Sequence, residues 1–363
     1  MASVINVGAL TINAEEARLV SEIIAPLIYQ NPDFLRYHNL VTGIDKKTQI
    51  VLDNGGGMAG WLDAGGTPPE SGGMDTVFSE LFWELVTIGD QKVHTQADLN
   101  QNFKMTVKKF AADHKNLEGS PELQAYIIAK IERYIKESVE RLIWLADTAA
   151  DSNANGGYLK PAVNKKYYNP IKGIWQQAFT YVGAGTTPRF TITANAQATK
   201  ALQNSVLTDA LAYAAIKGVY DNADDLLKSD KTAYIKATPK VYHGYISYLQ
   251  SSSLSGGGMT SMLVDGIQQP AYNGIPIYLD LFIGNRIISD MEVLTGSPSV
   301  ATYNLPHRVV MTTPANVPVA TLSDTDINTV ESFYYQKDRN NYMRFAYDLD
   351  VKVLRPELIS VGY

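Results

Sequence analysis

Near the C-terminus, apolar and polar residues alternate strictly, which predicts a long strand with one buried face. Met343, Phe345, Tyr347, Leu349, Val351 and Val353 form the apolar set, and Arg344, Ala346, Asp348, Asp350 and Lys352 form the other. Successive side chains of a strand point to opposite faces, so one set faces a core and the other faces solvent. We interpret the carboxylates of Asp348 and Asp350 as part of that solvated face and not as a metal or acid–base pair. Polar residues 338–341 predict a turn into this strand from an antiparallel neighbour.

The longest helical pattern starts at Ser120, a suitable N-cap, with Pro121 at the first helical position. From there to about Ala149 one face is apolar, and it comprises Leu123, Ile127, Ile131, Tyr134, Ile135, Leu142 and Leu145. A helix of about 30 residues would be ~43 Å long, far above the mean length, so we interpret it as a scaffold. A coiled-coil segment is the alternative, and it is disfavoured because the apolar residues do not repeat in sustained heptads.

Residues 41–95 predict a long β-arm. A strand at 48–52 leads into residues 54–73, which contain eight glycines and two prolines and therefore form neither a helix nor a central strand. A β-rich apolar run follows at 76–88. Contiguous apolar surface is rare in solvent, so we expect this arm to lie on another surface. The alternative is an ordinary surface loop that joins two core strands.

Shorter elements fill the rest of the chain. A polar N-terminal arm leads into a small amphipathic helix that ends near Asn31 and Pro32. Residues 150–300 have the pattern of a mixed α/β region. Its strands are expected at 189–193, 234–237 and 275–278, its helices around 207–219 and 245–249, and a further buried strand is expected at 308–312.

Composition excludes several classes of protein. The 363 residues are 45% hydrophobic and 19% charged, which is typical of a folded chain. The net charge of −6 argues against a general nucleic-acid binder. The absence of cysteine excludes disulfides, thiolate metal sites and a cysteine nucleophile, and it fits a reducing compartment. No apolar run approaches ~18 residues, and the N-terminus does not have the pattern of a secretory signal.

A search for catalytic or metal-binding motifs finds none that is complete. The five histidines are scattered, and no zinc helix, Walker loop or nucleophile elbow occurs. Residues 151–156 (DSNANG) match the first half of a calcium loop, but the twelfth position is Ala162 instead of an acid. We prefer to interpret this segment as a polar exit from the long helix. We therefore expect no catalytic site, no cofactor and no metal.

Three sequence segments in the second half of the chain resemble segments of a known protein family. They are residues 272–280 (YNGIPIYLD), 306–316 (PHRVVMTTPAN) and 344–359 (RFAYDLDVKVLRPELI). Together with the order of the elements, they resemble the Hong Kong 97-type major capsid protein of tailed bacteriophages. The resemblance implies an α+β, Hong Kong 97-like capsid fold. Its parts would be an N-arm (1–40), an extended loop or E-loop (41–95), a peripheral P domain with the spine helix (96–190), an axial A domain (191–325) and a return to the P domain (326–363).

The resemblance also implies a function. Such a protein self-assembles into hexamers and pentamers of an icosahedral phage head that encloses double-stranded DNA without sequence-specific binding. We therefore expect a structural homo-oligomer of the virion, assembled in the host cytoplasm, without enzymatic activity or membrane contact, and with scaffold, portal and decoration proteins as candidate partners. Candidate inter-subunit contacts on the E-loop and spine are Trp61, Leu62, Phe82, Trp83, Tyr126 and Tyr134. The alternatives are an encapsulin-like compartment, another phage structural protein, and a soluble enzyme with a dispersed site.

Overall fold

The computed structural model describes residues 31–44, 47–50, 81–94, 121–251, 261–264, 267–295, 300–323, 329–335, 337 and 340–363. The predicted N-terminal arm and its amphipathic helix lie outside these residues. So do the glycine-rich stretch 54–73 and the adjoining residues up to 80.

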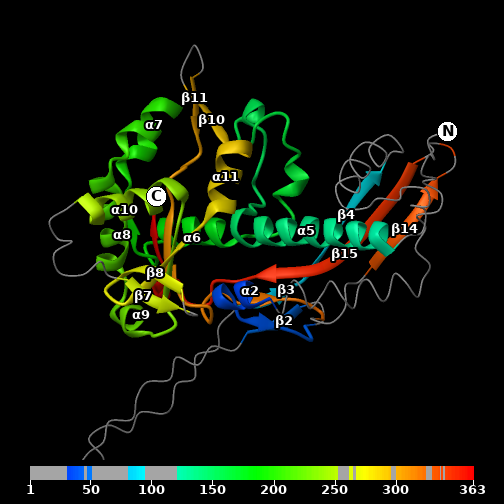
Figure 1. The fold of residues 1–363 in the computed structure, drawn as a ribbon, viewed down its shortest axis with the longest axis horizontal. Coiled ribbons are helices and arrows are strands. Elements are labelled where there is room, and N and C mark those ends of the chain that lie inside the picture. Colours follow the sequence, from blue (N-terminus) through cyan, green and yellow to red (C-terminus); the bar gives the residue numbers. More distant parts are fainter. Residues whose placement is uncertain are drawn as a thin grey trace, which may run out of the picture.

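A seven-stranded sheet forms the centre of the body (Figure 1). Its strand order is β5-β16-β12-β6-β9-β8-β7. The strands are β5 (Arg189–Phe190), β6 (Tyr234–Ala237), β7 (Ser261–Val264), β8 (Ile267–Tyr272), β9 (Ile275–Leu279), β12 (Val309–Thr312) and β16 (Ser360–Gly362). Every residue of β6 and β12 is buried, which explains why their side chains do not alternate between apolar and polar, although β6 carries one lysine, Lys236.

Helices cover both faces of this sheet. Val309 and Met311 of β12 point into a core shared with α8 and α10, and Val310 points into a second core shared with α5, α6 and α11. The helices are α5 (Pro121–Leu145), α6 (Ile174–Gly183), α7 (Lys200–Val206), α8 (Asp209–Asn222), α9 (Asp225–Ser229), α10 (Pro239–Ser251) and α11 (Leu281–Asp290). Strands that are buried on both sides need this double cover.

Two local predictions in the body need adjustment. The predicted strand at 189–193 ends at Phe190, because Thr193–Ala196 forms a 3₁₀ turn. The second short helix begins at Pro239 and not near Tyr245, since proline is well placed in a first helical turn. The Asn273-Gly274 turn between β8 and β9 is confirmed, with φ angles of 48° and 84°. Both angles suit a two-residue hairpin turn.

The long helix is confirmed, although it is shorter than predicted. α5 begins at Pro121 and ends at Leu145, a length of 25 residues. Just past its end, the carboxylate of Asp147 accepts a hydrogen bond from the Ala149 backbone N–H at 2.8 Å. An aspartate that bonds to the backbone two residues on forms a turn in place of a helix, which explains the earlier end.

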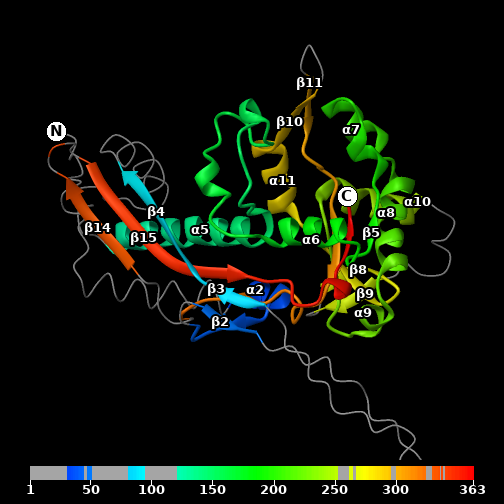
Figure 2. The same ribbon diagram turned by 180° about the vertical axis from the view of Figure 1, so that it is seen from behind.

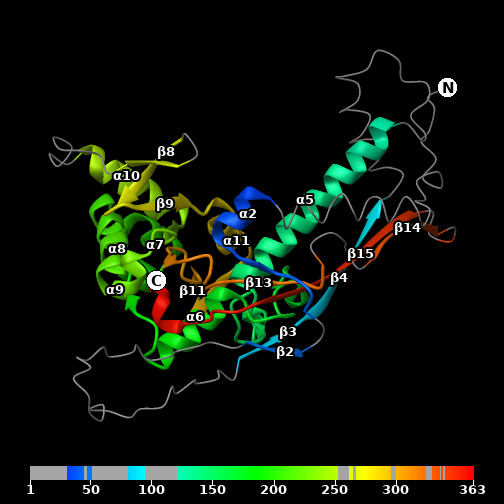
Figure 3. The same cartoon turned by 90° about the horizontal axis from the view of Figure 1, so that it is seen from below.

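A second sheet runs beside α5, away from the body (Figures 1 and 3). At its centre is β15 (Asn340–Val351), which pairs antiparallel with β14 (Thr329–Tyr335) on one edge and β4 (Val86–His94) on the other. We call these three strands the arm sheet, and Figure 2 shows β4 beside β15 from behind. The hairpin into β15 and its buried apolar face are confirmed, and the hydroxyl of Tyr347 donates to Ser138 of α5 at 2.8 Å.

The expectation of a solvated opposite face is wrong for Asp350. That residue is only 3% exposed, accepts a hydrogen bond from the Glu84 backbone N–H at 2.8 Å and pairs with Lys352 at 3.3 Å. The cover is a small sheet of β2 (Lys47–Gln49) and β3 (Phe82–Glu84). Burial raises the pKa of Asp350. Alternation in sequence could not reveal this cover, because it comes from residues about 270 positions earlier in the chain.

The remaining elements connect these parts. α2 (Pro32–Tyr37) leads into β1 (Leu40–Val41), which pairs parallel with β13 (Val319–Ala320), and β13 in turn pairs with β15. β10 (Glu292–Thr295) and β11 (Val300–Tyr303) form a hairpin that projects from the body (Figure 1). The domain boundaries at 96–190 and 191–325 stay a prediction.

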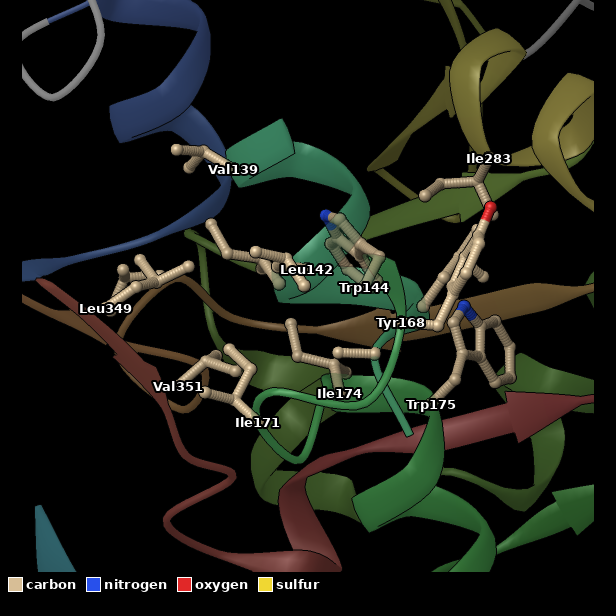
Figure 4. Packing of buried hydrophobic residues seen from close by; sticks show 14 of the residues in the cluster. Val139, Leu142, Trp144, Tyr168, Ile171, Ile174, Trp175, Ile283, Leu349 and Val351 are labelled. Atoms are coloured by element: carbon tan, nitrogen blue, oxygen red, sulfur yellow. The ribbon is translucent and has the colours of Figure 1, made fainter. Parts of the chain in front are cut away.

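A dense core lies where the end of α5 meets α6, α11 and the arm sheet. Figure 4 shows Leu142 of α5 beside Ile174 of α6, with Tyr168 between Trp144 and Trp175. The chain crosses the end of α5 at Gly173, whose N–H donates to the Ala146 carbonyl at 2.9 Å. A Cβ atom at Gly173 would lie 2.7 Å from the Ala146 backbone nitrogen. Glycine is therefore required at this crossing.

Replacing Gly173 by alanine is expected to lower the free energy of unfolding by about 1–3 kcal/mol, because two backbone segments must separate. Chemical denaturation measures the change. The matched control is Gly183→Ala in α6, where an added Cβ meets no heavy atom within 4 Å among the described residues. The control should shift stability by less than about 1 kcal/mol. Equal effects of the two substitutions would contradict the proposed close crossing.

Candidate functional site

The two histidines that the structure buries serve packing. His38 lies beside the rings of Phe34 and Trp144, and its Nδ1 bonds to the Val317 carbonyl at 2.9 Å. Burial lowers the pKa of His38 to about 3. His307 bonds through Nε2 to the Gln203 carbonyl at 2.9 Å. Within the described residues, no three histidines, aspartates or glutamates are placed to hold a metal ion.

The loop with calcium-like spacing is held by hydrogen bonds within it and by contacts to Lys165 and Glu292. The carboxylate of Asp151 accepts from the Ser152 backbone N–H at 2.7 Å and pairs with Lys165 at 3.3 Å. The hydrogen bond from Ser152 is the main cause that lowers the pKa of Asp151. Asn153 and Asn155 both donate through their amide nitrogens, to Glu292 and Asp151 respectively. These contacts agree with a structured polar exit from α5.

A buried charged group, Lys236, lies in the middle of β6. Its side chain is 4% exposed and pairs with Asp280 at 3.1 Å, whose own side chain is 7% exposed. The ammonium lies 4.3 Å from the ring centre of Trp144 and 4.5 Å from that of Tyr37. Asp280 also caps α11 by accepting from the Ile283 N–H at 3.1 Å. Carboxylate and aromatic faces together compensate the buried charge.

Lys236 marks a junction of four elements. Trp144 belongs to α5, Tyr37 to α2, Lys236 to β6, and Asp280 precedes α11. The segment that follows α2 is fixed at the same place, because the Tyr234 hydroxyl donates to the Tyr37 carbonyl at 3.0 Å. The junction therefore joins the long helix, the central sheet and the segment that leads in from the N-terminus.

An apolar cavity opens beside this junction, with a volume of about 100 Å³. Its lining consists of Phe34, Tyr37 and His38 from α2 and the residue after it, Lys136, Val139, Glu140, Ile143 and Trp144 from α5, and Lys236 from β6. We call it the junction cavity. Burial raises the pKa of Glu140.

A larger and more polar cleft of about 350 Å³ lies on another side of α5. Arg141 reaches into it, stacked near the rings of Tyr167 and Tyr168. Arg286 bridges Glu137 and Asp290 across the cleft at 3.2 and 3.6 Å. The positive charge of Arg286 and the negative charges of Glu137 and Asp290 compensate one another. The ion pair between Arg286 and Glu137 links α11 to α5.

The structure places the predicted contact residues in different surroundings. Trp83 is 5% exposed and packs inside its own chain against Ile44, Ile50 and Ala320. Phe82 is half-buried under the ammonium of Lys47, and half-buried Tyr134 lines the polar cleft. Trp61, Leu62 and the side chain of Tyr126 lie outside the described residues. Contact of all six residues with a neighbouring subunit stays a prediction.

Sequence reasoning missed the junction. Lys236 stands within the apolar run Tyr-Ile-Lys-Ala, and a lysine inside a buried-strand pattern was the signal that could have found it. Glu140 and Trp144 lie on the long helix, but helical periodicity does not tell which face meets α2.

Among the described residues, no helix combines the length and the apolar character that a membrane span requires.

Large apolar side chains are exposed on α11 and on the projecting β10–β11 hairpin. Leu281 and Ile288 of α11 and Leu294 and Val300 of the projecting hairpin are between 41% and 54% exposed. Single exposed apolar residues are ordinary, and these four lie on two elements that adjoin in the chain.

The solved structures that match this chain include chains of phage capsids. A chain of the satellite phage P4 procapsid, in a structure that includes the size determination (Sid) protein, matches with a TM-score of 0.51 and 10% identity. The match covers 94% of this chain and 98% of that chain. This likeness shows the fold: the chain has the Hong Kong 97-type capsid fold, and the predicted fold class is confirmed.

Two further matches have lower scores. A chain of Mycobacterium phage Ogopogo has a TM-score of 0.49 and 11% identity, over 90% of each chain. A chain of the holo-SrpI encapsulin complex from Synechococcus elongatus PCC 7942 has a TM-score of 0.43 and 10% identity, over 92% of this chain and 87% of that one. No protein-family model and no curated protein sequence matches the chain.

Proposed function

We propose that this chain is a major capsid protein that builds the shell of a phage head. In this proposal its copies form hexamers and pentamers of an icosahedral shell that encloses double-stranded DNA. The observation that carries the proposal is the fold shared with a chain of the P4 procapsid over nearly the full length of both chains. A shell closes when each copy presents the same complementary surfaces to its neighbours.

The projecting parts of the molecule support this role. α5 and the arm sheet extend beyond the body, and an extension of this kind buries more apolar surface when a neighbour covers it. The exposed apolar residues of α11 and the β10–β11 hairpin offer a second contact surface. Many modest contacts, repeated around a closed shell, add up to a stability that no single contact has.

A structural role, without catalysis, is part of the same proposal. The junction cavity is accounted for by packing between α2, α5 and β6, and the polar cleft by charges that compensate one another.

Expression of the full chain, followed by size-exclusion chromatography and negative-stain microscopy, tests the proposal. We expect capsomers or closed particles at micromolar concentration. A chain that stays monomeric under all ionic conditions, with a native circular dichroism spectrum, would overturn the proposal. The ratio of nucleic acid to protein in particles from the natural source separates a phage head from an encapsulin-like compartment, because only the head holds a genome.

A further inference from the structure

The junction cavity has the properties of a socket for a side chain. It is open to the outside and mainly apolar, and its walls come from α2, α5 and β6, which meet where the rings of Tyr37 and Trp144 contact the Lys236 ammonium. A cavity of about 150 Å³ with apolar walls can accept a benzene ring. At about 100 Å³ with an open mouth, the junction cavity can take part of a flat aromatic ring that enters edge-on.

One carboxylate that lines this cavity, that of Glu140, has no hydrogen-bonding or salt-bridge partner among the described residues. Lys136 and Lys236 also line the cavity, and both act on Glu140 through their charges. A fitting occupant is therefore an apolar ring that carries a single hydrogen-bond donor and that gains from nearby cations.

The chain itself contains such a group. Residues 51–80 include five acids (Asp53, Asp63, Glu70, Asp75, Glu80) and neither lysine nor arginine. Within this acidic stretch Trp61 is the only tryptophan, and it follows directly on Gly60. An indole supplies a flat ring and one N–H donor, and it is a common anchor at the centre of protein interfaces.

We propose that Trp61 of a second copy of the chain inserts into the junction cavity and that its indole N–H donates to the carboxylate of Glu140. The inference rests on the proposed shell function and identifies the receptor for the arm. The acidic flanks of Trp61 then lie near Lys136 at the rim of the cavity. The ring covers Val139 and Ile143 and approaches the ring of Trp144.

The geometry of the arm's base favours a second copy over the same chain. Residues 51–80 leave the described structure at Ile50 and return at Leu81, which are joined by a hydrogen bond of 2.8 Å. This base belongs to the small sheet that covers Asp350. The side chains of Leu349 and Val351 face the α5 core, and Asp350 points the other way, so the base and α5 lie on opposite sides of β15.

Cysteine cross-linking gives the direct test, because the chain has no native cysteine. Chains carrying Trp61→Cys and chains carrying Glu140→Cys are mixed, assembled and oxidised. We expect a disulfide-linked dimer of one chain of each kind, identified by mass spectrometry of its peptides. The matched control replaces Glu140→Cys by Leu226→Cys, a residue that is 67% exposed on α9, and should give no such dimer.

The outcomes separate this inference from the proposed function. Shells that form without the 61–140 disulfide overturn the inference and leave the proposed function intact. A disulfide that forms only within one chain carrying both cysteines also overturns it. Chains of wild-type sequence that never assemble overturn the proposed function and this inference with it.

Substitution at position 61 gives a second readout. Trp61→Ala should raise the concentration needed for assembly by roughly tenfold or more, as expected for loss of a central aromatic anchor. Trp61→Phe keeps most of the ring without the donor and should fall between Trp61→Ala and the unchanged chain. An assembly threshold that Trp61→Ala leaves unchanged would contradict the insertion. The circular dichroism spectrum should be the same for all three chains.

Discussion

Lys236→Met is expected to lower the free energy of unfolding by about 3–5 kcal/mol, the cost of leaving a buried charge without its partner. Asp280 would stay inside the protein, with its carboxylate still bonded to the Ile283 N–H. The substitution also removes the cation that lies between the rings of Tyr37 and Trp144. Methionine has a similar length and fits the space, so the loss reports on charge more than on volume.

Urea denaturation of the unassembled chain measures this effect. The matched control is Lys217→Met, which removes an exposed i,i+4 pair with Asp221 and should change stability by less than about 1 kcal/mol. The double variant Lys236→Met with Asp280→Asn should recover part of the loss, because the uncompensated carboxylate is gone and asparagine still caps α11. A Lys236→Met chain as stable as the Lys217→Met chain would contradict the role of the junction.

Acid is expected to destabilise the chain through His38. The pKa of His38 is lowered from 6.5 to about 3 in the folded protein, mainly by burial, with the nearby ammonium of Lys236 acting in the same direction. Above pH 6.5 the residue is neutral in both states and contributes nothing. As the pH falls from 6.5 toward 3, the unfolded chain binds a proton that the folded chain does not. Stability therefore drops by up to about 4 kcal/mol over that range.

The variant His38→Asn isolates this contribution from the other titrating groups. Its amide nitrogen can donate to the Val317 carbonyl as Nδ1 does, and it does not titrate. Unfolding free energies measured every half pH unit should fall less steeply for the variant between pH 6.5 and 4. Parallel curves for the two proteins would show that His38 does not remain neutral in the folded state.

Elements with a strong period could be predicted from the sequence, since their side-chain pattern follows from local geometry. The buried face of β15 is an example, because Phe345, Tyr347 and Leu349 alternate with more polar residues. The start of α5 at Pro121 is another, because the residues that begin a helix are local signals. The hairpin turn at Asn273 and Gly274 belongs with them, since both positions require positive φ angles.

Features made by contact between distant segments could not be predicted in this way. The alternation in β15 placed Asp350 on a solvated face, and only the cover by β3 shows that it is buried. In the same way, β4 pairs along most of β15 although about 250 residues separate the two strands in sequence. The junction cavity needs α2, α5 and β6 together, and no single segment carries a sign of it.

The length of β15 has a mechanical consequence. It is one uninterrupted strand of 12 residues, paired at both edges, and it lies beside α5 at an angle to the helix. Two stiff members joined side by side resist bending much better than either alone. A force on the outer end of the arm sheet should therefore rotate α5 and the arm sheet together as one rigid unit. That rotation would displace Trp144 at the other end of α5, and with it the surroundings of Lys236.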